Sequence, residues 1–438
     1  EKFFDVVTYT GNGVAGRTVA HNLGSVPAVI MTKKLAGGGP DSWAVYHTSL
    51  GNTKYLQLDT ALGAGTSTSL WNDTSPDSTE FTVGTNSACN ENNATYVAYL
   101  FASDAGGFGE DEDENIIKCG SYTTDGSGNA TVSLGFEPQW VLNKVSSASD
   151  NWTIADNMRG FSVTNEQRLY ANLANAEAAA TTFRPTSTGY TVNGGETSKT
   201  YIYMAIRRPM KTPESGTEVF NVTTSATSTA QAAPTPVQYY SGFPVDLMLL
   251  GSDIVTYSGA RYAHDRLTQG RMQTSATTAE NYVGDMFDAN EGYRPVTLSP
   301  STNYYAYLFK RATGFMDVVA YTGTGVPGQT QAHNLGVVPE LMIVKWRNDG
   351  NDPWVVYSAT LGNTKYLKLN TDAAGAVQSG MWNNTTPTAS VFTLGDRSET
   401  NNSNASDKYI AYLFATLAGV SKVGSYTGTG ADLNVDCG

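Results

Sequence analysis

Two tryptophans, Trp71 and Trp382, stand in short segments of similar composition and are the strongest candidates for ligand binding. Trp71 precedes Asn72 in LWNDTSP, and Trp382 precedes Asn383 in MWNNTTP. An indole beside an amide suits carbohydrate recognition, because a flat apolar face stacks on a sugar ring while polar groups fix its hydroxyls. The alternative is structural: the indole fills the end of a β-sandwich core and the asparagine caps a loop.

Trp43 and Trp354 form a second related pair, in the segments SWAVYH and PWVVYS. We include both among the carbohydrate-binding candidates. They lie in alternating apolar sequence, where every second side chain points to the same face of a strand. One of Trp43 and Tyr46 is therefore expected in the core.

Metal and cofactor chemistry has little support in the sequence. The acidic run EDEDE at Glu110–Glu114 contains Asp111 and Asp113, which are weak calcium candidates because calcium prefers several oxygen ligands. The run has no EF-hand spacing and is typical of a solvated linker. The four histidines and three cysteines lack metal-ligand spacing, so we expect free thiols and no cofactor.

The chain repeats itself at long range, which predicts an array of folding units. Three segments of the first hundred residues return nearly unchanged: Phe3–Tyr9 as Phe315–Tyr321, Ala20–Pro27 as Ala332–Pro339, and Leu50–Leu56 as Leu361–Leu367. The offset between the histidines of the second pair is 333 − 21 = 312 residues. His21 and His333 each precede Asn-Leu-Gly, a context in which a histidine more often hydrogen-bonds the backbone of a turn than binds a ligand.

Short alternating segments separated by turn sequences indicate an all-β fold. FFDVVTYT, PAVIMTK, KYLQLDT and TYVAYLFA are strand-like, and GNG, SLGNT and NDTSPDST are turn-like. Six or seven such strands in about 100 residues are typical of an antiparallel β-sandwich. We expect a tandem array of five sandwich repeats in three types, the last one partial: 3–104 (first type), 116–208 (second), 217–311 (third), 315–417 (first again) and 420–438 (second, partial).

The near-identical repeats also test for catalysis, because an active site shared by both copies must keep its residues. Glycoside hydrolysis needs two carboxylates. Three carboxylates change between the copies, where Asp59, Asp73 and Glu80 become Asn370, Asn384 and Val391. Asp5 is retained as Asp317 and Asp41 as Asp352, so a catalytic pair common to both copies is absent or would have to use these two positions. Asp5 lies in an alternating strand and is interpreted as a structural or edge residue. We therefore predict that the protein is not an enzyme.

Composition restricts the partners. Charged residues make up only 15% of the chain, against about 25% in average globular proteins, and the net charge is −13. An acidic surface without a basic stripe argues against nucleic-acid binding, and no apolar run is long enough for a membrane helix. The richness in Thr, Ser, Asn and Gly favours an extracellular location.

The segments FDVVTYTGNGVAGRTVAHNLGSVPAVIMTKK, WAVYH, LGNTKYLQLDT, WNDTSP and YVAYLFA resemble the repeated β-domain of large virion proteins of marine tailed phages, which are described as tail-fibre or structural proteins of unknown function. The resemblance covers the first and fourth repeats well. It implies a virion surface role and transfers no catalytic residues.

Together these observations predict a phage virion appendage protein, a tail fibre or spike, that contributes to host-surface attachment. Its expected partners are further copies of itself, other virion proteins and a host cell-surface glycan. One alternative is a bacterial extracellular adhesin or filament subunit in which Val420–Gly438 is donated as a strand. Another is the carbohydrate-binding part of a secreted polysaccharide-degrading enzyme.

Overall fold

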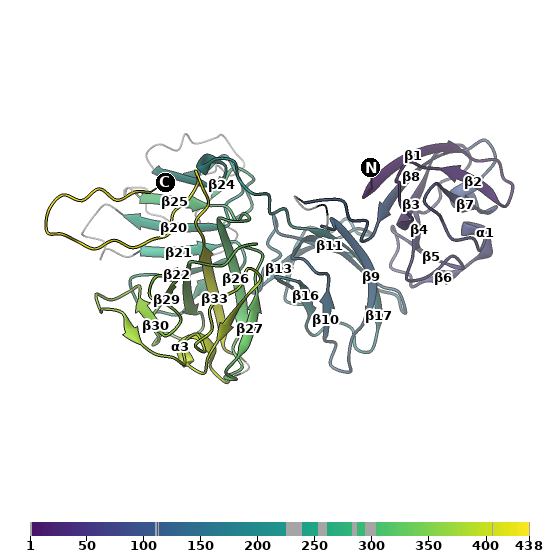
Figure 1. Ribbon diagram of the computed structural model, residues 1–438. Coiled ribbons are helices and arrows are strands. Elements are labelled where there is room, and N and C mark those ends of the chain that lie inside the picture. Colours follow the sequence, from purple (N-terminus) through teal and green to yellow (C-terminus); the bar gives the residue numbers. More distant parts are fainter. Residues whose placement is uncertain are drawn as a thin grey trace. The chain divides into compact units, whose positions relative to one another are not determined.

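The computed structural model describes residues 2–109, 112, 114–224, 239–252, 261–282, 287–293, 304–404 and 406–437. The chain divides into two compact units (Figure 1). Unit 1 comprises Glu1–Asp156 and Asn165–Pro209, and unit 2 comprises Asn157–Thr164 and Met210–Gly438. Each unit contains two β-sandwich modules, which we number 1 to 4 along the chain.

Module 1 pairs a large sheet with a small one. The large sheet has the strand order β1-β8-β3-β4-β5-β6, and the small sheet is β2-β7. The strands are β1 (Phe4–Thr10), β2 (Arg17–Ala20), β3 (Pro27–Ala36), β4 (Ala44–His47), β5 (Lys54–Gln57), β6 (Gly65–Thr66), β7 (Glu80–Val83) and β8 (Thr95–Ala102). Two short helices, α1 (Thr68–Trp71) and α2 (Ser87–Asn90), flank β7 in sequence.

Module 4 repeats this topology strand for strand, as its near-identical sequence requires. Its large sheet is β26-β33-β28-β29-β30-β31 and its small sheet is β27-β32. The elements are β26 (Met316–Thr322), β27 (Gln329–Ala332), β28 (Leu341–Trp346), β29 (Val355–Ser358), β30 (Lys365–Lys368), β31 (Ala376–Val377), β32 (Val391–Leu394), α3 (Ser398–Asn401) and β33 (Lys408–Phe414).

Module 2 has the same order in its large sheet, β9-β17-β11-β12-β13-β14, and a three-stranded small sheet, β10-β16-β15. Its strands are β9 (Ile117–Thr123), β10 (Ala130–Ser133), β11 (Pro138–Val145), β12 (Thr153–Asp156), β13 (Glu166–Tyr170), β14 (Ala178–Ala180), β15 (Phe183–Thr186), β16 (Gly189–Val192) and β17 (Thr200–Arg207).

Module 3, the most divergent in sequence, keeps the same plan. Its large sheet is β18-β25-β20-β21-β22-β23 and its small sheet is β19-β24. The elements are η1 (Gly216–Glu218), β18 (Phe220–Thr224), β19 (Tyr239–Tyr240), β20 (Leu247–Ser252), β21 (Arg261–Asp265), β22 (Gly270–Gln273), β23 (Asn281–Tyr282), β24 (Gly292–Tyr293) and β25 (Tyr304–Phe309). The expected all-β tandem array of antiparallel sandwiches is therefore confirmed.

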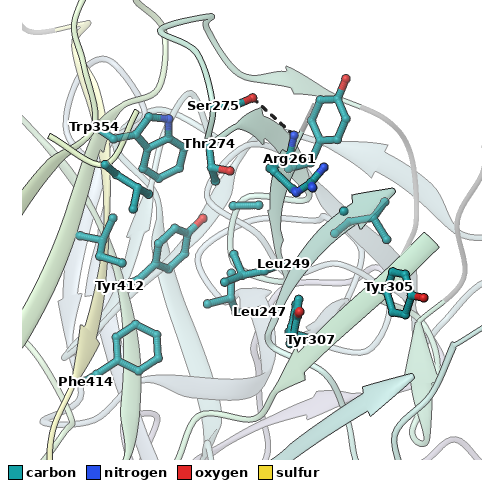
Figure 2. A pocket seen from close by; sticks show the side chains of 16 residues that line it. Leu247, Leu249, Arg261, Thr274, Ser275, Tyr305, Tyr307, Trp354, Tyr412 and Phe414 are labelled. Carbon is teal, nitrogen blue, oxygen red and sulfur yellow. Dashed lines mark hydrogen bonds between the residues drawn. The ribbon is translucent and has the colours of Figure 1, made fainter. Parts of the chain in front are cut away.

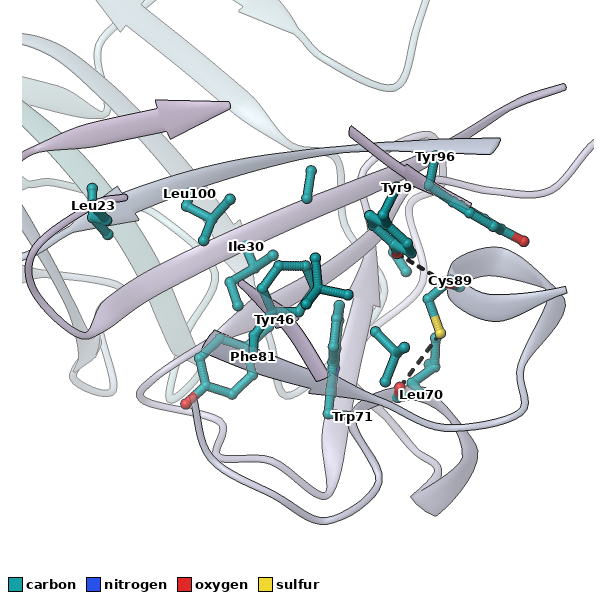
Figure 3. Packing of buried hydrophobic residues seen from close by; sticks show 14 of the residues in the cluster. Tyr9, Leu23, Ile30, Tyr46, Leu70, Trp71, Phe81, Cys89, Tyr96 and Leu100 are labelled. Atoms are coloured by element: carbon teal, nitrogen blue, oxygen red, sulfur yellow. Dashed lines mark hydrogen bonds between the residues drawn. The ribbon is translucent and has the colours of Figure 1, made fainter. Parts of the chain in front are cut away.

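The core of each sandwich lies between its large and small sheets. In module 1, Ile30 and Tyr46 from the large sheet meet Phe81 from the small sheet, and Trp71 closes the same cluster (Figure 3). Successive side chains of a strand point to opposite faces. This periodicity places Ile30 inside the sandwich and its neighbours Val29 and Met31 on the outer face of the large sheet.

That outer face is buried as well, because the two modules of each unit pack their large sheets against each other. The first six residues of β3 are all buried, which requires cover on both faces. In unit 1, Val29 and Met31 of module 1 belong to one apolar cluster with Leu142 and Met204 of module 2. The corresponding cluster in unit 2 joins modules 3 and 4. Each unit is thus a stack of four sheets, with the two large sheets in the middle.

The segment expected to begin a fifth repeat has no strand among its described residues. Leu417 and Ser421 form an isolated bridge, and Gly424–Cys437 is exposed throughout. Assignment of 420–438 to a partial repeat therefore stays a prediction from the sequence.

Candidate functional site

The indoles of Trp71 and Trp382 lie in the sandwich cores. Their side chains are 2% and 0% exposed. Trp71 packs edge-to-face on Tyr46 with ring centroids 5.8 Å apart, and Trp382 packs in the same way on Tyr357 at 5.7 Å. An aromatic ring without an exposed face cannot stack on a sugar, so the prediction of carbohydrate binding at these tryptophans is wrong.

Asn72 and Asn383 both adopt a left-handed backbone conformation. Asn72 caps the C-terminus of α1 with φ 52° and ψ 32°, and Asn383 also has φ 52°. Asparagine tolerates this left-handed region better than most residues and often ends a helix there. The structure therefore supports the alternative interpretation, in which the indole fills the core of the sandwich and the asparagine caps a loop.

Trp43 and Trp354 lie on the outer faces of the large sheets. Trp43 is half-buried, stacks on Tyr99 with centroids 6.0 Å apart, and carries Lys33 over its ring at 5.8 Å. Trp354 is 0% exposed and stacks on Tyr412 at 6.3 Å. Neither ring has an open face on which a glycan could stack. Trp354 lies at the interface between modules 3 and 4.

The carboxylates shared by the two near-copies hold turns. Asp5 accepts a hydrogen bond from the backbone N–H of Asn22 at 2.7 Å, and Asp317 accepts the same bond from Asn334 at 2.7 Å. Asp317 is also ion-paired with Arg311 inside the protein. These contacts agree with the structural interpretation of both aspartates.

The calcium candidates Asp111 and Asp113 lie outside the described residues. Their described neighbour Glu114 forms an ion pair with Arg207 at 2.6 Å. No group of three or more potential metal ligands occurs within the described ranges. Cys89, Cys119 and Cys437 are free thiols, as expected.

The two corresponding histidines act as turn residues, as predicted. The Nδ1 atom of His21 accepts from the N–H of Leu23 at 3.3 Å, and its Nε2 lies 3.2 Å from the carbonyl oxygen of Asp77. His333 repeats both contacts, with Leu335 at 3.3 Å and Thr388 at 3.2 Å.

The most regular polar feature is the interface between the two modules of a unit, which we call the joint and which occurs once in each unit. In unit 1, Trp152 Nε1 donates to the carbonyl oxygen of Gln57 at 2.8 Å, and Lys144 Nζ donates to that of Ala61 at 3.1 Å. In unit 2, Trp354 Nε1 donates to Gln273 at 2.9 Å, and Lys345 Nζ donates to Thr277 at 2.9 Å. In each unit, side chains of the second module therefore donate hydrogen bonds to backbone carbonyl groups of the first module.

The accepting residues occupy equivalent positions. Ala61 follows Gln57 by four residues, and Thr277 follows Gln273 by four. A backbone bond three residues further on completes the match: Ala64 donates to Ser146 in unit 1 and Glu280 donates to Arg347 in unit 2. Two pairs of modules with different sequences thus dock by one rule.

The two units differ in where this joint is open: unit 1 has a hollow of about 330 Å³ that Gln57, Ala64 and Ser149 line, whereas unit 2 has a cavity between its large sheets. The cavity has a volume of about 430 Å³ and lies between the large sheets of modules 3 and 4, where Leu247, Leu249, Trp354, Tyr412 and Phe414 line it (Figure 2). At the joint of unit 1 the space between Met31, Leu142 and Trp152 is about 10 Å³. A cavity of several hundred Å³ with an apolar wall is the size of a small-molecule site.

Three replacements in module 3 explain why this joint is open. Strand register aligns Val45 with Ala263 and Lys33 with Gly251, since Met31 pairs with Val45 as Leu249 pairs with Ala263. The third replacement puts Arg261, the residue before Tyr262, where module 1 has Trp43. Glycine and alanine leave space that lysine and valine fill in module 1.

A buried carboxylate lies behind the wall of the cavity. Tyr412 donates its hydroxyl to Asp265 Oδ2 at 2.8 Å, behind the lining. Burial raises the pKa of Asp265 to about 6. The described lining residues include no carboxylate, histidine, cysteine or lysine, and their only charged side chain is that of Arg261.

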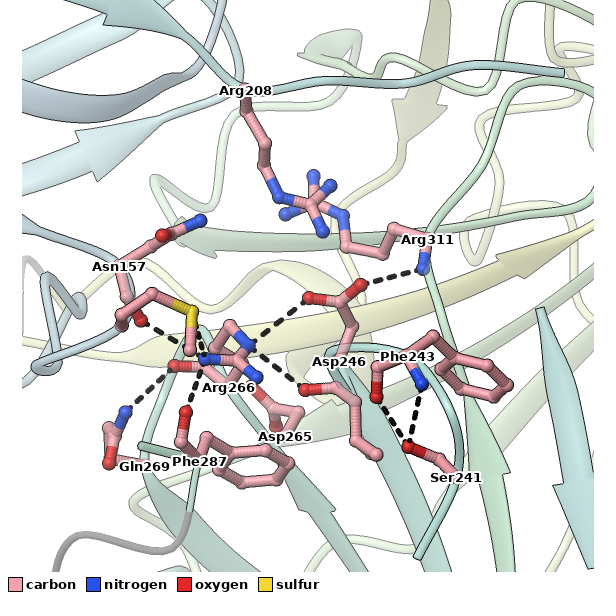
Figure 4. A network of polar contacts seen from close by, with 12 residues as sticks. Asn157, Arg208, Ser241, Phe243, Asp246, Asp265, Arg266, Gln269, Phe287 and Arg311 are labelled. Carbon is pink, nitrogen blue, oxygen red and sulfur yellow. Dashed lines mark hydrogen bonds and ion pairs between the residues drawn. The ribbon is translucent and has the colours of Figure 1, made fainter. Parts of the chain in front are cut away.

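A buried ionic network anchors β20 beside the cavity (Figure 4). Arg266 Nε donates to the carbonyl oxygen of Val245 at 2.9 Å and lies 3.4 Å from Asp246 Oδ1. Asp246 Oδ2 accepts from the N–H of Arg311 at 2.7 Å. Because buried charges are costly unless they are paired, this network fixes the start of β20 at Leu247.

The residues of the joint and the cavity were not identified from the sequence. A lysine recurs at equivalent positions of three modules, as Lys33, Lys144 and Lys345, and this recurrence was the available signal. Its acceptors are backbone carbonyls, which have no sequence signature. The cavity depends on two small residues, Gly251 and Ala263, in the most divergent module.

Comparison with known proteins gives a family without a function. A family model described as a domain of unknown function (DUF7483) matches residues 1–209 and 308–438, well over half of the chain. No curated protein and no solved structure matches. No described helix is long and apolar enough to cross a membrane. The chain therefore belongs to the DUF7483 family, whose function is unknown.

Proposed function

We propose that this protein is a structural component of a phage virion appendage, a tail fibre or spike, and that it contributes to attachment at the host surface. The observation that carries the proposal is the repeated joint, in which Trp152 and Trp354 dock equivalent module pairs through the same backbone contacts. A single docking rule lets a chain add pairs of modules without a new kind of interface inside each pair.

A tandem array of modules is useful where a protein must span a distance or bind a surface at several points. Tethered copies of a weak binding surface raise the effective concentration of each copy and increase overall avidity. The sequence resemblance to virion proteins of tailed phages points in the same direction, as does the acidic, Thr- and Asn-rich composition. The proposal places the chain on the virion surface, as a homo-oligomer in contact with other virion proteins.

The host-facing surface is not formed by the tryptophans that the sequence suggested, because Trp71 and Trp382 are buried. A host glycan remains the proposed receptor class, bound elsewhere on the modules. In this proposal the chain is not an enzyme.

Particle proteomics tests the proposal. Phage particles purified by density gradient should contain peptides of this chain at a fixed ratio to the major tail protein, and antibodies against it should label the tail by immunogold electron microscopy. Adsorption of the phage should fall when cells are incubated first with the purified chain. Recovery of the chain only from the bacterial envelope would instead support an adhesin, and release of reducing ends from polysaccharides would support an enzyme.

A further inference from the structure

The cavity of unit 2 has a mostly apolar wall, with Arg261, Thr274 and Ser275 as polar residues along one edge (Figure 2). Leu247, Leu249 and Ala263 contribute aliphatic groups from module 3, and Ile343 and Leu369 contribute them from module 4. Hydrocarbon side chains cannot form hydrogen bonds with a hydroxyl group of a ligand. A ligand hydroxyl group that is buried against them without a partner therefore lowers the affinity.

The ends of the cavity differ in exposure. Trp354 and Tyr412 are 0% and 2% exposed and form a buried inner end. Tyr305 and Tyr307 are 42% and 43% exposed and form a mouth that a ligand can reach. Figure 2 shows Tyr412 and Trp354 on the opposite side of the cavity from Tyr305. The shape is that of a slot between two sheets, closed within and open at one side.

The equivalent joint of unit 1 shows that docking does not require an opening between the two large sheets. The same tryptophan and lysine contacts form there around a space of about 10 Å³. Close packing is the rule in protein interiors, and an apolar void loses the contacts that would line it. Among the described residues, an opening of about 430 Å³ between the large sheets in unit 2, at the place where unit 1 is closely packed, is therefore a feature of the sequence of module 3.

We propose that this cavity binds a small apolar molecule with an elongated hydrocarbon body, such as a fatty alcohol or acyl chain. The hydrocarbon fills the slot along the aliphatic wall and displaces water that cannot hydrogen-bond well to it. The aromatic rings at the mouth cover the outer end of the chain. The aliphatic part of the wall offers no hydrogen-bond partner to the hydroxyl groups of a sugar ring. The inference goes beyond the virion role and does not depend on it.

Fluorescence titration of the full chain with N-phenyl-1-naphthylamine tests the proposal. This neutral aromatic probe is dark in water and bright in an apolar site. We expect saturable binding of one probe per chain, with displacement by dodecanol and no displacement by glucose or mannose. Absence of saturable binding would overturn the proposal, and displacement by a monosaccharide but not by dodecanol would overturn the ligand class.

Two variants locate the site. Ala263→Leu places a branched side chain in the slot and should weaken probe binding at least about tenfold, which corresponds to 1.4 kcal/mol. Its matched control is Val45→Leu at the equivalent position of the closed joint, which should leave binding unchanged. Equal loss in both variants, or full binding by Ala263→Leu, would contradict the assignment.

The second variant avoids the risk that a core substitution disturbs folding. Leu369 lines the cavity and is 45% exposed, so Leu369→Asp should be tolerated by the fold. A carboxylate at the mouth must be desolvated when hydrocarbon binds, and affinity should fall about tenfold or more. Circular dichroism and melting temperature verify that each variant is folded. Unchanged affinity in folded Leu369→Asp would refute the site.

Discussion

Removing the indole N–H of Trp354 should weaken the joint of unit 2 in a calculable way. Trp354→Phe removes the donor that lies 2.9 Å from the carbonyl oxygen of Gln273. Leaving a buried acceptor without its partner costs about 1–3 kcal/mol. The smaller ring also buries roughly 40 Å² less apolar surface, worth about 1 kcal/mol at about 25 cal/mol per Å². The expected loss in the free energy of unfolding is about 2–4 kcal/mol.

The matched variant in unit 1 is Trp152→Phe, which removes the donor to Gln57. A third variant, Trp43→Phe, changes the residue equivalent to Trp354 in module 1, where the ring is only half-buried. Its expected cost is below about 1 kcal/mol, because less surface is lost.

Differential scanning calorimetry of the full chain measures these effects, since each unit should unfold as its own transition. A loss of 2–4 kcal/mol in a unit of this size lowers its melting temperature by roughly 4–16 °C. Trp354→Phe should shift one transition and Trp152→Phe the other. If Trp354→Phe shifts its transition no more than Trp43→Phe does, the indole–carbonyl bond does not stabilise the joint and the reasoning fails.

Three further predictions concern buried polar groups. Asp317→Asn should cost about 3–5 kcal/mol in chemical denaturation, because it removes the buried carboxylate charge that is ion-paired with Arg311, whereas Asp5→Asn should cost about 1 kcal/mol or less; similar losses would refute the distinction. Burial lowers the pKa of His47 to about 4, so its contribution to the free energy of unfolding is present above pH 6.5 and is lost as the pH falls through 4, by up to about 3 kcal/mol. His47→Gln should therefore weaken the dependence of the unfolding free energy on pH between these values. An unchanged pH dependence in this variant would contradict the prediction. Burial raises the pKa of Cys89 to about 12 and also raises that of Cys119, so Ellman's reagent should titrate only Cys437 in the native protein and all three thiols in denaturant; rapid reaction of a second native thiol would contradict the packing.

The repeat pattern made the fold accessible from the sequence. Alternating segments such as TYVAYLFA and a turn such as SLGNT predicted strands and their connections, and β8 and β33 occupy the expected places. Even the third repeat was recognised from NYYAYLFKR, which contains β25. Period-two alternation depends on local backbone geometry, so it survives when most other residues change.

The site was less accessible, because it depends on contacts between modules. Trp71 beside Asn72 has the composition of a sugar site, and only the packing on Tyr46 shows that the ring is enclosed. The partners of Trp152 and Lys144 are carbonyl groups, which every residue carries. Burial of both faces of β3 could be inferred from its long apolar run, but not the identity of the module that covers it.

Modules 1 and 4 present nearly the same outer face to different neighbours. Module 1 is covered by the module that follows it, and module 4 by the module that precedes it. In module 1 this region accepts hydrogen bonds at main-chain carbonyl groups, and in module 4 it supplies the tryptophan and lysine donors. A surface that can act as either partner tolerates exchange of whole modules by recombination between related genes. Such a chain can gain, lose or shuffle blocks without a matching change in the adjoining block, and its length and specificity can evolve separately.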